Sequence, residues 1–266
     1  MVGKFYEQFP YPLLSELPQK HLETYADQVI ACAGLNTKKL HGKMVLDAGC
    51  GTGEIACSLA THAKKVVGID LSKASLAHAK MLVKKYQLKN IEFIEKDAFE
   101  LDAREKFDVI VSLGMLHHTY NPKKGFEIVS SCVKKDGIFI MGFYHSLGGI
   151  KQRVQKFLVG LFAGERPEKK LQFIEWYLGK KLGNHQRAFW ADRIANPREQ
   201  YYRISEIKKW FEENGFEVMG IQAHKPQFNV GNISSSLEIW KFELFLLVNG
   251  YRFVIMVGKR KSKNFT

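Results

Sequence analysis

The sequence predicts an α/β fold built on a parallel sheet, and three observations lead to this prediction. Between residues 43 and 145, five short apolar runs alternate with longer amphipathic segments. A glycine-rich turn follows the first apolar run, and a sheet-like pattern returns between residues 205 and 261. Strands that alternate with helices form right-handed βαβ units, whose strands lie parallel in one sheet.

The first 40 residues are predicted to form an arm and one helix. The arm, Phe5 to Pro18, interleaves aromatic residues with prolines, which favours an extended chain because proline restricts both itself and the preceding residue. Apolar residues then recur at helical spacing from Leu22 to Ala33, and Gly34 is expected to end that helix.

Residues 41–145 supply the alternating strands and helices. Apolar runs predict strands at 44–49, 66–70, 91–97, 107–114 and 137–145. Amphipathic segments predict helices at 54–62, from Ser72 to about 87, and at 122–134. Ser72 is a suitable N-cap, because its hydroxyl can accept a hydrogen bond from a free N–H of the first turn.

Residues 146–203 interrupt this rhythm, because they contain no strand-like run. Amphipathic helices rich in Lys, Arg and aromatic residues are predicted there, as an insert after the fifth strand. This position at the carboxyl edge of the sheet predicts that the insert covers a binding site.

The sheet pattern resumes after the insert. Ser205 is expected to cap a helix that Gly215 ends, and strands are predicted at 216–224 and 251–261. The sequence does not determine the structure of the apolar stretch at 237–249.

Composition excludes several classes of protein. The 266 residues are 45% hydrophobic and 25% charged, which is ordinary globular usage and excludes a disordered or collagen-like chain. The four cysteines form no CxxC pair, so we expect a reducing compartment and no metal site. The N-terminus lacks the pattern of a signal peptide, and no apolar run reaches the ~18 residues of a transmembrane segment, which predicts a cytoplasmic protein.

The net charge of +13 is unevenly distributed. Residues 41–150 hold 15 basic and 12 acidic side chains, a net +3, whereas residues 151–266 hold 21 and 11, a net +10. The basic excess therefore belongs to the insert and the C-terminal elements.

The segment VLDAGCGTGEIA (45–56) contains the strongest candidate site. It runs from a strand through Asp47 and the glycines Gly49, Gly51 and Gly53 into a helix. Glycines let the backbone turn sharply and let a ligand lie against main-chain N–H groups. A dinucleotide would place its anionic pyrophosphate at this helix start, where the flanking acids would repel it. The acids instead suit a ligand with an ammonium or sulfonium group.

Two further acids end the next two predicted strands. Asp70 lies 17 residues after Gly53, where a carboxylate can accept hydrogen bonds from both hydroxyls of a ribose. Asp97 ends the third strand and could accept an adenine amino proton, while the N–H of Ala98 donates to the ring. Open α/β sheets bind ligands at these carboxyl ends of parallel strands.

At these residues the chain resembles the class I S-adenosylmethionine-dependent methyltransferases. The resemblance covers residues 41–145 closely and residues 205–261 more loosely. It implies a Rossmann-like methyltransferase fold, a mostly parallel seven-stranded sheet in the order 3-2-1-4-5-7-6 with an antiparallel last strand. It also implies S-adenosyl-L-methionine as the cofactor.

The resemblance implies roles for individual residues as well. Gly49 and Gly51 would approach the methionine part of the cofactor, and Asp47 would lie near its ammonium group. Leu113 and Gly114, which end the fourth strand, would supply backbone contacts near the amino acid moiety. The predicted cofactor site consists of Asp47, Gly49, Gly51, Gly53, Asp70, Leu71, Asp97, Ala98, Leu113 and Gly114, together with Tyr6 and Tyr11 of the N-terminal arm.

The fourth strand ends in SLGMLHHTYNP (112–122), where many relatives keep their chemistry. It lacks the Asn/Asp-Pro-Pro-aromatic run typical of enzymes that methylate base amines, and its Leu-His-His run resembles that of many small-molecule methyltransferases. His117 or His118 could serve as general base, because an imidazole titrates near neutrality. Alternatively the histidines are structural, and alignment of the reactants supplies the acceleration without a base.

Two segments are expected to border the site. Tyr6 and Tyr11 could fold over the cofactor, since aromatic faces suit a sulfonium, or they could pin the arm to the core. The insert is expected to line the acceptor pocket with Phe173, Trp176, Tyr177, Phe189, Trp190, Tyr201 and Tyr202, near Arg187, Arg193, Arg198 and Arg203. These side chains could bind nucleic acid, clamp an acidic metabolite, dock on an anionic membrane, or form a core with a solvated basic face.

The predicted division is an N-terminal lid (1–40), a cofactor-binding core (41–145), a helical insert over the acceptor site (146–203) and the remaining sheet with a basic tail (204–266). The predicted function is in-line transfer of a methyl group from S-adenosylmethionine to an oxygen or nitrogen of a small acidic or aromatic acceptor. The alternatives are an RNA methyltransferase that uses its basic C-terminal half, and a non-catalytic S-adenosylmethionine-binding protein. The sequence does not determine the oligomeric state.

Overall fold

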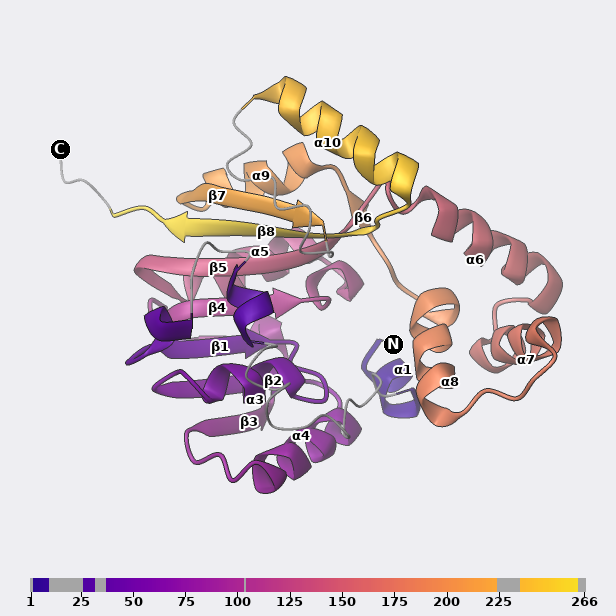
Figure 1. Ribbon diagram of the computed structural model, residues 1–266, viewed down its shortest axis with the longest axis horizontal. Coiled ribbons are helices and arrows are strands. Elements are labelled where there is room, and N and C mark those ends of the chain that lie inside the picture. The colour runs from indigo at the N-terminus through magenta and orange to yellow at the C-terminus, as the bar shows by residue number, and fades with distance from the viewer. Residues whose placement is uncertain (1, 10–25, 32–36, 103, 224–234, 263–266) are drawn as a thin grey trace.

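The structure, a computed structural model, describes residues 2–9, 26–31, 37–102, 104–223 and 235–262. Its centre is a sheet in the order β3-β2-β1-β4-β5-β8-β7, with β6 beside β5 (Figure 1). The strands are β1 (Met44–Ala48), β2 (Lys65–Asp70), β3 (Ile91–Glu95), β4 (Phe107–Leu113), β5 (Val133–His145), β6 (Tyr201–Tyr202), β7 (Phe216–Ala223) and β8 (Phe253–Arg260).

The strand directions confirm the predicted fold class. β3, β2, β1, β4 and β5 are parallel, and β8 is antiparallel to both of its neighbours, β5 and β7. With β7 and β8 as the sixth and seventh main strands, this is the order that the resemblance implied. The parallel strands all end at one edge of the sheet, so the loops after β1, β2 and β4 lie together there.

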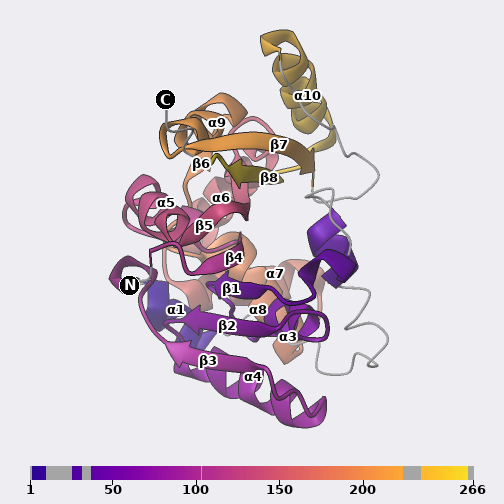
Figure 2. The same ribbon diagram turned by 90° about the vertical axis from the view of Figure 1, so that its left-hand side faces the viewer.

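Helices cover both faces of the sheet (Figures 1 and 2). They are α1 (Val2–Gln8), a helical segment at 26–31, α3 (Glu54–Ala60), α4 (Lys73–Lys85), α5 (Pro122–Ser131), α6 (Ile150–Ala163), α7 (Pro167–Leu178), α8 (Asn184–Trp190), α9 (Ile204–Glu213) and α10 (Ser236–Asn249). One hydrophobic cluster joins the sheet to α5, α9 and α10, and a second joins it to residues 26–31, α3 and α4. Among these helices, none is both long and apolar enough to span a membrane.

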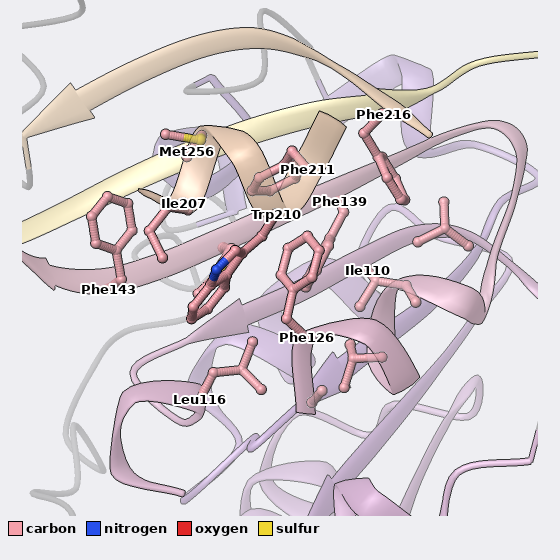
Figure 3. Packing of buried hydrophobic residues seen from close by; sticks show 14 of the residues in the cluster. Ile110, Leu116, Phe126, Phe139, Phe143, Ile207, Trp210, Phe211, Phe216 and Met256 are labelled. Atoms are coloured by element: carbon pink, nitrogen blue, oxygen red, sulfur yellow. The ribbon is translucent and has the colours of Figure 1, made fainter. Parts of the chain in front are cut away.

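The larger core lies between the sheet and the helices α5 and α9 (Figure 3). The ring of Phe126 lies 5.3 Å from that of Phe139 and 4.9 Å from that of Phe211, between ring centroids. Leu116, which begins the short 3-10 helix Leu116–His118, is fully buried in the same cluster. Core packing therefore fixes the position of the two histidines that follow Leu116.

The predicted extended arm is wrong over residues 5–8, which belong to helix α1. Phe5 and Phe9, one helical turn apart, are buried in a third cluster with Leu171 and Ile194. Apolar spacing therefore outweighs the prolines here, because the first of them, Pro10, follows the helix and does not interrupt it. All three prolines of the arm, Pro10, Pro12 and Pro18, lie outside the described residues.

The predicted end of the helix at 122–134 and the predicted start of the strand at 137–145 are also wrong. α5 ends at Ser131, and β5 begins at Val133 and not at residue 137. Val133 pairs with Phe107, and the register then shifts before Val109 pairs with Ile138. This irregular start interrupts the alternation on which the sequence prediction depends.

Two elements of the C-terminal half were not predicted. β6 is a two-residue strand that pairs with Tyr144 and His145, beyond the point where β4 ends, although no strand was expected in residues 146–203. The undetermined stretch at 237–249 lies within helix α10, whose N-cap Ser235 accepts a hydrogen bond from the N–H of Glu238.

Ser205 is not the N-cap of α9, contrary to the prediction. The cap is Arg203, and its backbone N–H donates to the Glu206 carboxylate at 2.7 Å. The helix starts early because β6 holds the chain up to Tyr202. This start depends on a tertiary pairing, which a local pattern does not reveal.

Candidate functional site

The turn between β1 and α3 contains three glycines with positive φ, at 80° for Gly49, 52° for Gly51 and 85° for Gly53. A Cβ on Gly49 would lie 2.3 Å from the Cβ of Met115, and a Cβ on Gly53 would lie 2.6 Å from that of Ala79. Packing therefore requires these two glycines. A Cβ on Gly51 would meet no described residue within 4 Å, so within the described part of the chain Gly51 faces space that a ligand can enter.

Asp70, at the end of β2, holds this turn in place. Its Oδ2 accepts a hydrogen bond from the N–H of Gly51, and its Oδ1 accepts one from the N–H of Ser72, both at 2.9 Å. Burial raises the pKa of Asp70, and the two backbone hydrogen bonds oppose that effect. Each oxygen can still accept from a second donor, such as a hydroxyl group.

Asp47, near the end of β1, is a buried acid without full compensation. It is 1% exposed, and its Oδ2 makes no hydrogen bond to any described residue. Burial, followed by the charges of Asp70 and Glu54, raises its pKa to about 8, while a backbone contact with Ala56 opposes the rise. A cation bound beside Asp47 would remove this cost, so the residues present fit a positively charged ligand.

The remaining residues predicted for the cofactor site differ in their surroundings. Asp97 caps a 3-10 turn, since its Oδ1 accepts from the N–H of Phe99 at 2.9 Å. Ala98 is buried, whereas Leu71 is half exposed. Gly114 follows Leu113 at the end of β4 with φ of 100°, and a Cβ there would meet none of the residues that the structure describes within 4 Å. Gly114 therefore offers a second open approach to the backbone.

The structure distinguishes the two candidate histidines. The Nδ1 of His118 lies 2.7 Å from the carbonyl oxygen of Arg198, so Nδ1 carries the proton and Nε2 is left as an acceptor. Burial lowers the pKa of His118, although Asp192 and the Arg198 carbonyl partly oppose this. His118 is therefore neutral at pH 7.

His117 is enclosed more completely. Its ring lies 3.9 Å from that of Tyr144, and neither ring nitrogen makes a hydrogen bond to a described residue. Burial, and then the neighbouring His118 and Arg252, lower its pKa well below the usual range. The nearby backbone of Gly142 raises the pKa of His117 in part, although it makes no hydrogen bond to the ring. His117 is thus a neutral packing residue in this structure.

Tyr6 of α1 connects the glycine-turn region to residues 146–203. Its hydroxyl donates to Asp192 Oδ1 at 2.8 Å and accepts from Asn196 Nδ2 at 3.0 Å. Its carbonyl accepts from the hydroxyl of Ser72 at 3.5 Å, and its ring packs edge-to-face against that of His118, with ring centroids 6.2 Å apart. Tyr11, the other aromatic residue predicted for this site, lies outside the described residues.

Sequence reasoning missed several residues of this region. The ring of Tyr144 contacts His117 on one side and lies 4.1 Å below the guanidinium of Arg252 on the other. Arg252 Nη1 in turn lies 3.6 Å from Glu199 Oε1. Tyr144 stands near the carboxyl end of β5, so the rule for strand ends could have identified it. Nothing in the local sequence signals Arg252 or Glu199.

The predicted aromatic lining is wrong in part. Trp176, Tyr177 and Phe189 are exposed, and Tyr201 is the insert aromatic whose ring lies 5.6 Å from that of Tyr144. The spacing of aromatics identified a helical segment without revealing which faces turn outward. Two surface hollows lie elsewhere, one along α6 and one between α4 and β3.

Known proteins resemble this chain in sequence and in fold. A family model described as a methyltransferase domain matches residues 39–215, more than half of the chain. A protein of Geobacillus sp. (strain WCH70) named as a methyltransferase is 25% identical over 235 residues, which is 82% of this chain and 91% of the relative. A ubiquinone biosynthesis O-methyltransferase of Coxiella burnetii is 27% identical over 209 residues, 75% of each chain.

A solved structure gives the same picture for the fold. The magnesium protoporphyrin IX methyltransferase of Synechocystis PCC 6803 with bound SAH superposes with a TM-score of 0.59 at 18% identity, over 97% of this chain and 93% of that chain. The strand order and the acid-lined glycine turn agree with the family match. The chain therefore belongs to the methyltransferase-domain family and is a class I S-adenosylmethionine-dependent methyltransferase.

Proposed function

We propose that the enzyme transfers the methyl group to an oxygen or nitrogen of a small acidic or aromatic acceptor, with His118 as the general base. The observation that carries this proposal is the hydrogen bond from His118 Nδ1 to the Arg198 carbonyl, which leaves Nε2 as a neutral acceptor beside Tyr6 and Tyr144. The similarity to a relative named as an O-methyltransferase of ubiquinone biosynthesis supports a small acceptor with a hydroxyl group.

On the cofactor side, S-adenosylmethionine supplies a methyl group that its sulfonium already activates. Asp47 would pair with the ammonium group, since it is buried beside the glycine turn and its Oδ2 makes no hydrogen bond to a described residue. Asp70 would accept hydrogen bonds from the ribose hydroxyls while it continues to hold Gly51 and Ser72. The open sides of Gly51 and Gly114 would let the backbone approach the ligand closely.

On the acceptor side, His118 would take the proton of the attacking hydroxyl or amine at Nε2. Burial keeps the ring neutral, and the Arg198 carbonyl holds it in the required tautomer. His117 has no such freedom, because it is packed against Tyr144 with both nitrogens buried. We therefore assign the base to His118 and a packing role to His117.

The surroundings of His118 favour an acidic or aromatic acceptor. The rings of Tyr144 and Tyr201 lie 5.6 Å apart, and the guanidinium of Arg252 stands over Tyr144. An aromatic acceptor would pack against such rings, and an acidic group would pair with Arg252. Lys156 and Arg203 donate hydrogen bonds to Glu199 and Glu243, so these two cations offer RNA phosphates little to bind. The Nη1 of Arg252 lies 3.6 Å from Glu199 but makes no hydrogen bond to a described residue, so it can still donate to an acidic acceptor.

The proposal is tested with labelled S-adenosylmethionine in a lysate that is then fractionated into small molecules, protein and RNA. Label in the small-molecule fraction supports the proposal. Label confined to RNA or protein contradicts it, and no label in any fraction indicates a cofactor-binding protein without transfer activity.

The base is tested with His118→Asn, because Asn Nδ2 can keep the bond to the Arg198 carbonyl while Nε2 is lost. We expect turnover to fall by about 10²-fold or more with cofactor affinity retained. His117→Asn is the matched control and should change turnover only a few-fold. In the wild type, burial of His118 predicts that the rate declines only below pH 6.5, its ordinary pKa. Full activity of His118→Asn would mean that alignment alone supplies the acceleration.

A further inference from the structure

The outer side of α6 exposes an apolar stripe. Ile150, Val154, Phe157, Leu158 and Leu161 recur at helical spacing, and all five are exposed, Phe157 by 65% and Leu161 by 64%. Val159 and Gln152, on the opposite side of the same helix, are buried. Ile150, Val154 and Phe157 also line a surface hollow, together with Arg153. The exposed face of a helix is normally polar, so an apolar stripe on the exposed side of α6 indicates a surface that binds a partner.

The stripe continues into aromatic residues at the end of α6 and on α7. Phe162 stacks on Phe173 with ring centroids 5.7 Å apart, and Phe173 contacts Trp176 at 5.5 Å. Phe162 and Trp176 are each 74% exposed. We call the stripe and these two residues the α6–α7 apolar face. In Figure 1, α6 and α7 project from the side of the sheet.

Exposed cations without an acidic partner among the described residues lie on and beside helices α6 and α7. Residues 146–203 contain 12 basic and 5 acidic side chains, a net +7. Each of the five acids already binds side chains of the protein: Glu165 binds Lys170, Glu168 and Glu175 bind Arg187, Asp192 binds Tyr6, and Glu199 binds Lys156. Lys151, Arg166, Lys169 and Lys180 are exposed and form no ion pair with any described residue.

We propose that the α6–α7 apolar face docks on the surface of an anionic lipid bilayer. Amphipathic helices bind such surfaces when Trp, Phe and Leu enter the boundary of the acyl chains and flanking Lys and Arg meet the anionic headgroups. A second copy of the chain fits less well, because a symmetric contact would bring the unpaired cations of both copies together. The inference does not depend on the identity of the methyl acceptor.

The charge around the face distinguishes it from a similar stripe on α10. There Leu237, Trp240, Leu244 and Val248 are exposed at helical spacing. Lys241 is the one cation within that helix, which also contains Glu238 and Glu243. Helix α10 itself therefore supplies less of the cationic border that favours anionic lipid than α6 and α7 do.

The inner side of α6 connects the docking face to the candidate site. Gln152 Nε2 donates to the Arg193 carbonyl at 2.7 Å, and Lys156 Nζ donates to the Asn196 carbonyl at 2.6 Å. Asn196 also holds Tyr6. The inner side of α6 thus supports the segment with Arg193 and Asn196 that borders the candidate site. Docking would place the bilayer on the outer side of the same helix.

The test is co-sedimentation of the full chain with vesicles of phosphatidylcholine, alone or mixed with phosphatidylglycerol. We expect binding to the mixed vesicles that falls with added salt, and weaker binding to phosphatidylcholine alone. Phe157→Ser with Leu161→Ser should weaken binding to mixed vesicles by about tenfold or more, because two inserted apolar side chains are lost. Lys151→Glu with Lys169→Glu should weaken binding to mixed vesicles to a similar extent at low salt. At high salt the difference between this variant and the wild type should disappear, because the charges are screened.

Met81→Ser on α4 is the matched control, because Met81 is also exposed but stands outside the face. It should bind vesicles as the wild type does. Thermal unfolding and S-adenosylmethionine affinity should be unchanged in every variant, which separates loss of docking from loss of folding or of the cofactor site. Absence of vesicle binding by the wild type would overturn the proposal. So would a wild-type dimer that Phe157→Ser with Leu161→Ser converts into a monomer, since the occupant would then be a second copy.

Discussion

Two regions of this molecule bury a carboxylate and treat it in opposite ways. At the end of β1, Asp47 has an oxygen without a hydrogen bond to any described residue, and burial beside Asp70 and Glu54 raises its pKa to about 8. At the junction of β5, α9 and α10, Glu243 is 2% exposed but lies among donors. Although burial opposes them, these donors lower its pKa to about 2.

The partners of Glu243 come from the start of α9 and the end of β5. Arg203 donates to Oε2 through Nε at 2.8 Å, and the N–H of Ile204 donates to Oε1 at 3.0 Å. His145 Nδ1 accepts a hydrogen bond from the N–H of Gly148, so the ring proton is on Nε2. This Nε2 donates to Glu243 Oε1, with 3.2 Å between the two atoms.

The difference shows how a binding site can be distinguished from a structural ion pair. A buried charge that the protein itself pairs serves the fold, because its removal would leave its partners uncompensated. A buried acid that the protein leaves without a partner costs stability, and a bound cation can offset that cost. The glycine-turn region has the second property, and the junction at Glu243 has the first.

The largest change in stability is expected when the ion pair of Glu243 with Arg203 is broken. Glu243→Gln leaves Arg203 and His145 without their acid, and we expect the free energy of unfolding at pH 7 to fall by about 3–5 kcal/mol. In the wild type this contribution is present above the ordinary pKa of 4.5 and is lost as the pH falls toward 2. Urea denaturation measures it, with exposed Glu212→Gln as control. A loss no larger than in the control would contradict this account.

The next effect has the opposite sign. Folded Asp47 keeps its proton up to about pH 8, whereas the unfolded chain loses it near pH 3.8, so stability without cofactor declines as the pH rises between these values. Asp47→Asn removes the decline and should raise the free energy of unfolding at pH 8 by on the order of 2–4 kcal/mol. The same variant should bind S-adenosylmethionine more weakly. If the variant and the wild type show the same thermal unfolding from pH 5 to 8, folding does not raise the pKa of Asp47.

A smaller effect is expected at Asp70, which serves both the turn and the proposed ribose site. Asp70→Ala should weaken S-adenosylmethionine binding by about 10- to 100-fold, because charged hydrogen bonds to the ligand are lost and the N–H groups of Gly51 and Ser72 lose their acceptor. Asp70→Asn keeps one acceptor oxygen and should lie between that variant and the wild type. Titration calorimetry provides the comparison, and unchanged affinity in the Ala variant would remove Asp70 from the proposed site.

The smallest effect separates capping from recognition at Asp97. Asp97→Ala should lose about 1 kcal/mol of stability, because the N–H of Phe99 loses its acceptor. Asp97→Ser can keep the cap, so its stability should stay near the wild-type value while cofactor affinity falls a few-fold. If both variants bind the cofactor as tightly as the wild type does, Asp97 is only a cap.

Much of the cofactor half could be predicted from the sequence because its signals are local. The strand periods, the capping hydroxyl of Ser72 and the glycine turn each act over a few residues, and the structure has all three. The C-terminal half was less predictable. The start of α9 at Arg203 depends on β6, which forms only because Tyr201 and Tyr202 meet the end of β5.

The sequence by itself determined the strand order through its resemblance to a known family, and it identified the acids and glycines at the carboxyl edge. Only the tertiary structure decided which acid lacks a partner, which histidine has a free acceptor and which aromatic residues turn outward. The physical reason is distance along the chain. His118 obtains its tautomer from a carbonyl 80 positions away, and Tyr6 is held by an acid 186 positions away. Such pairings form only when the folded core brings distant segments together.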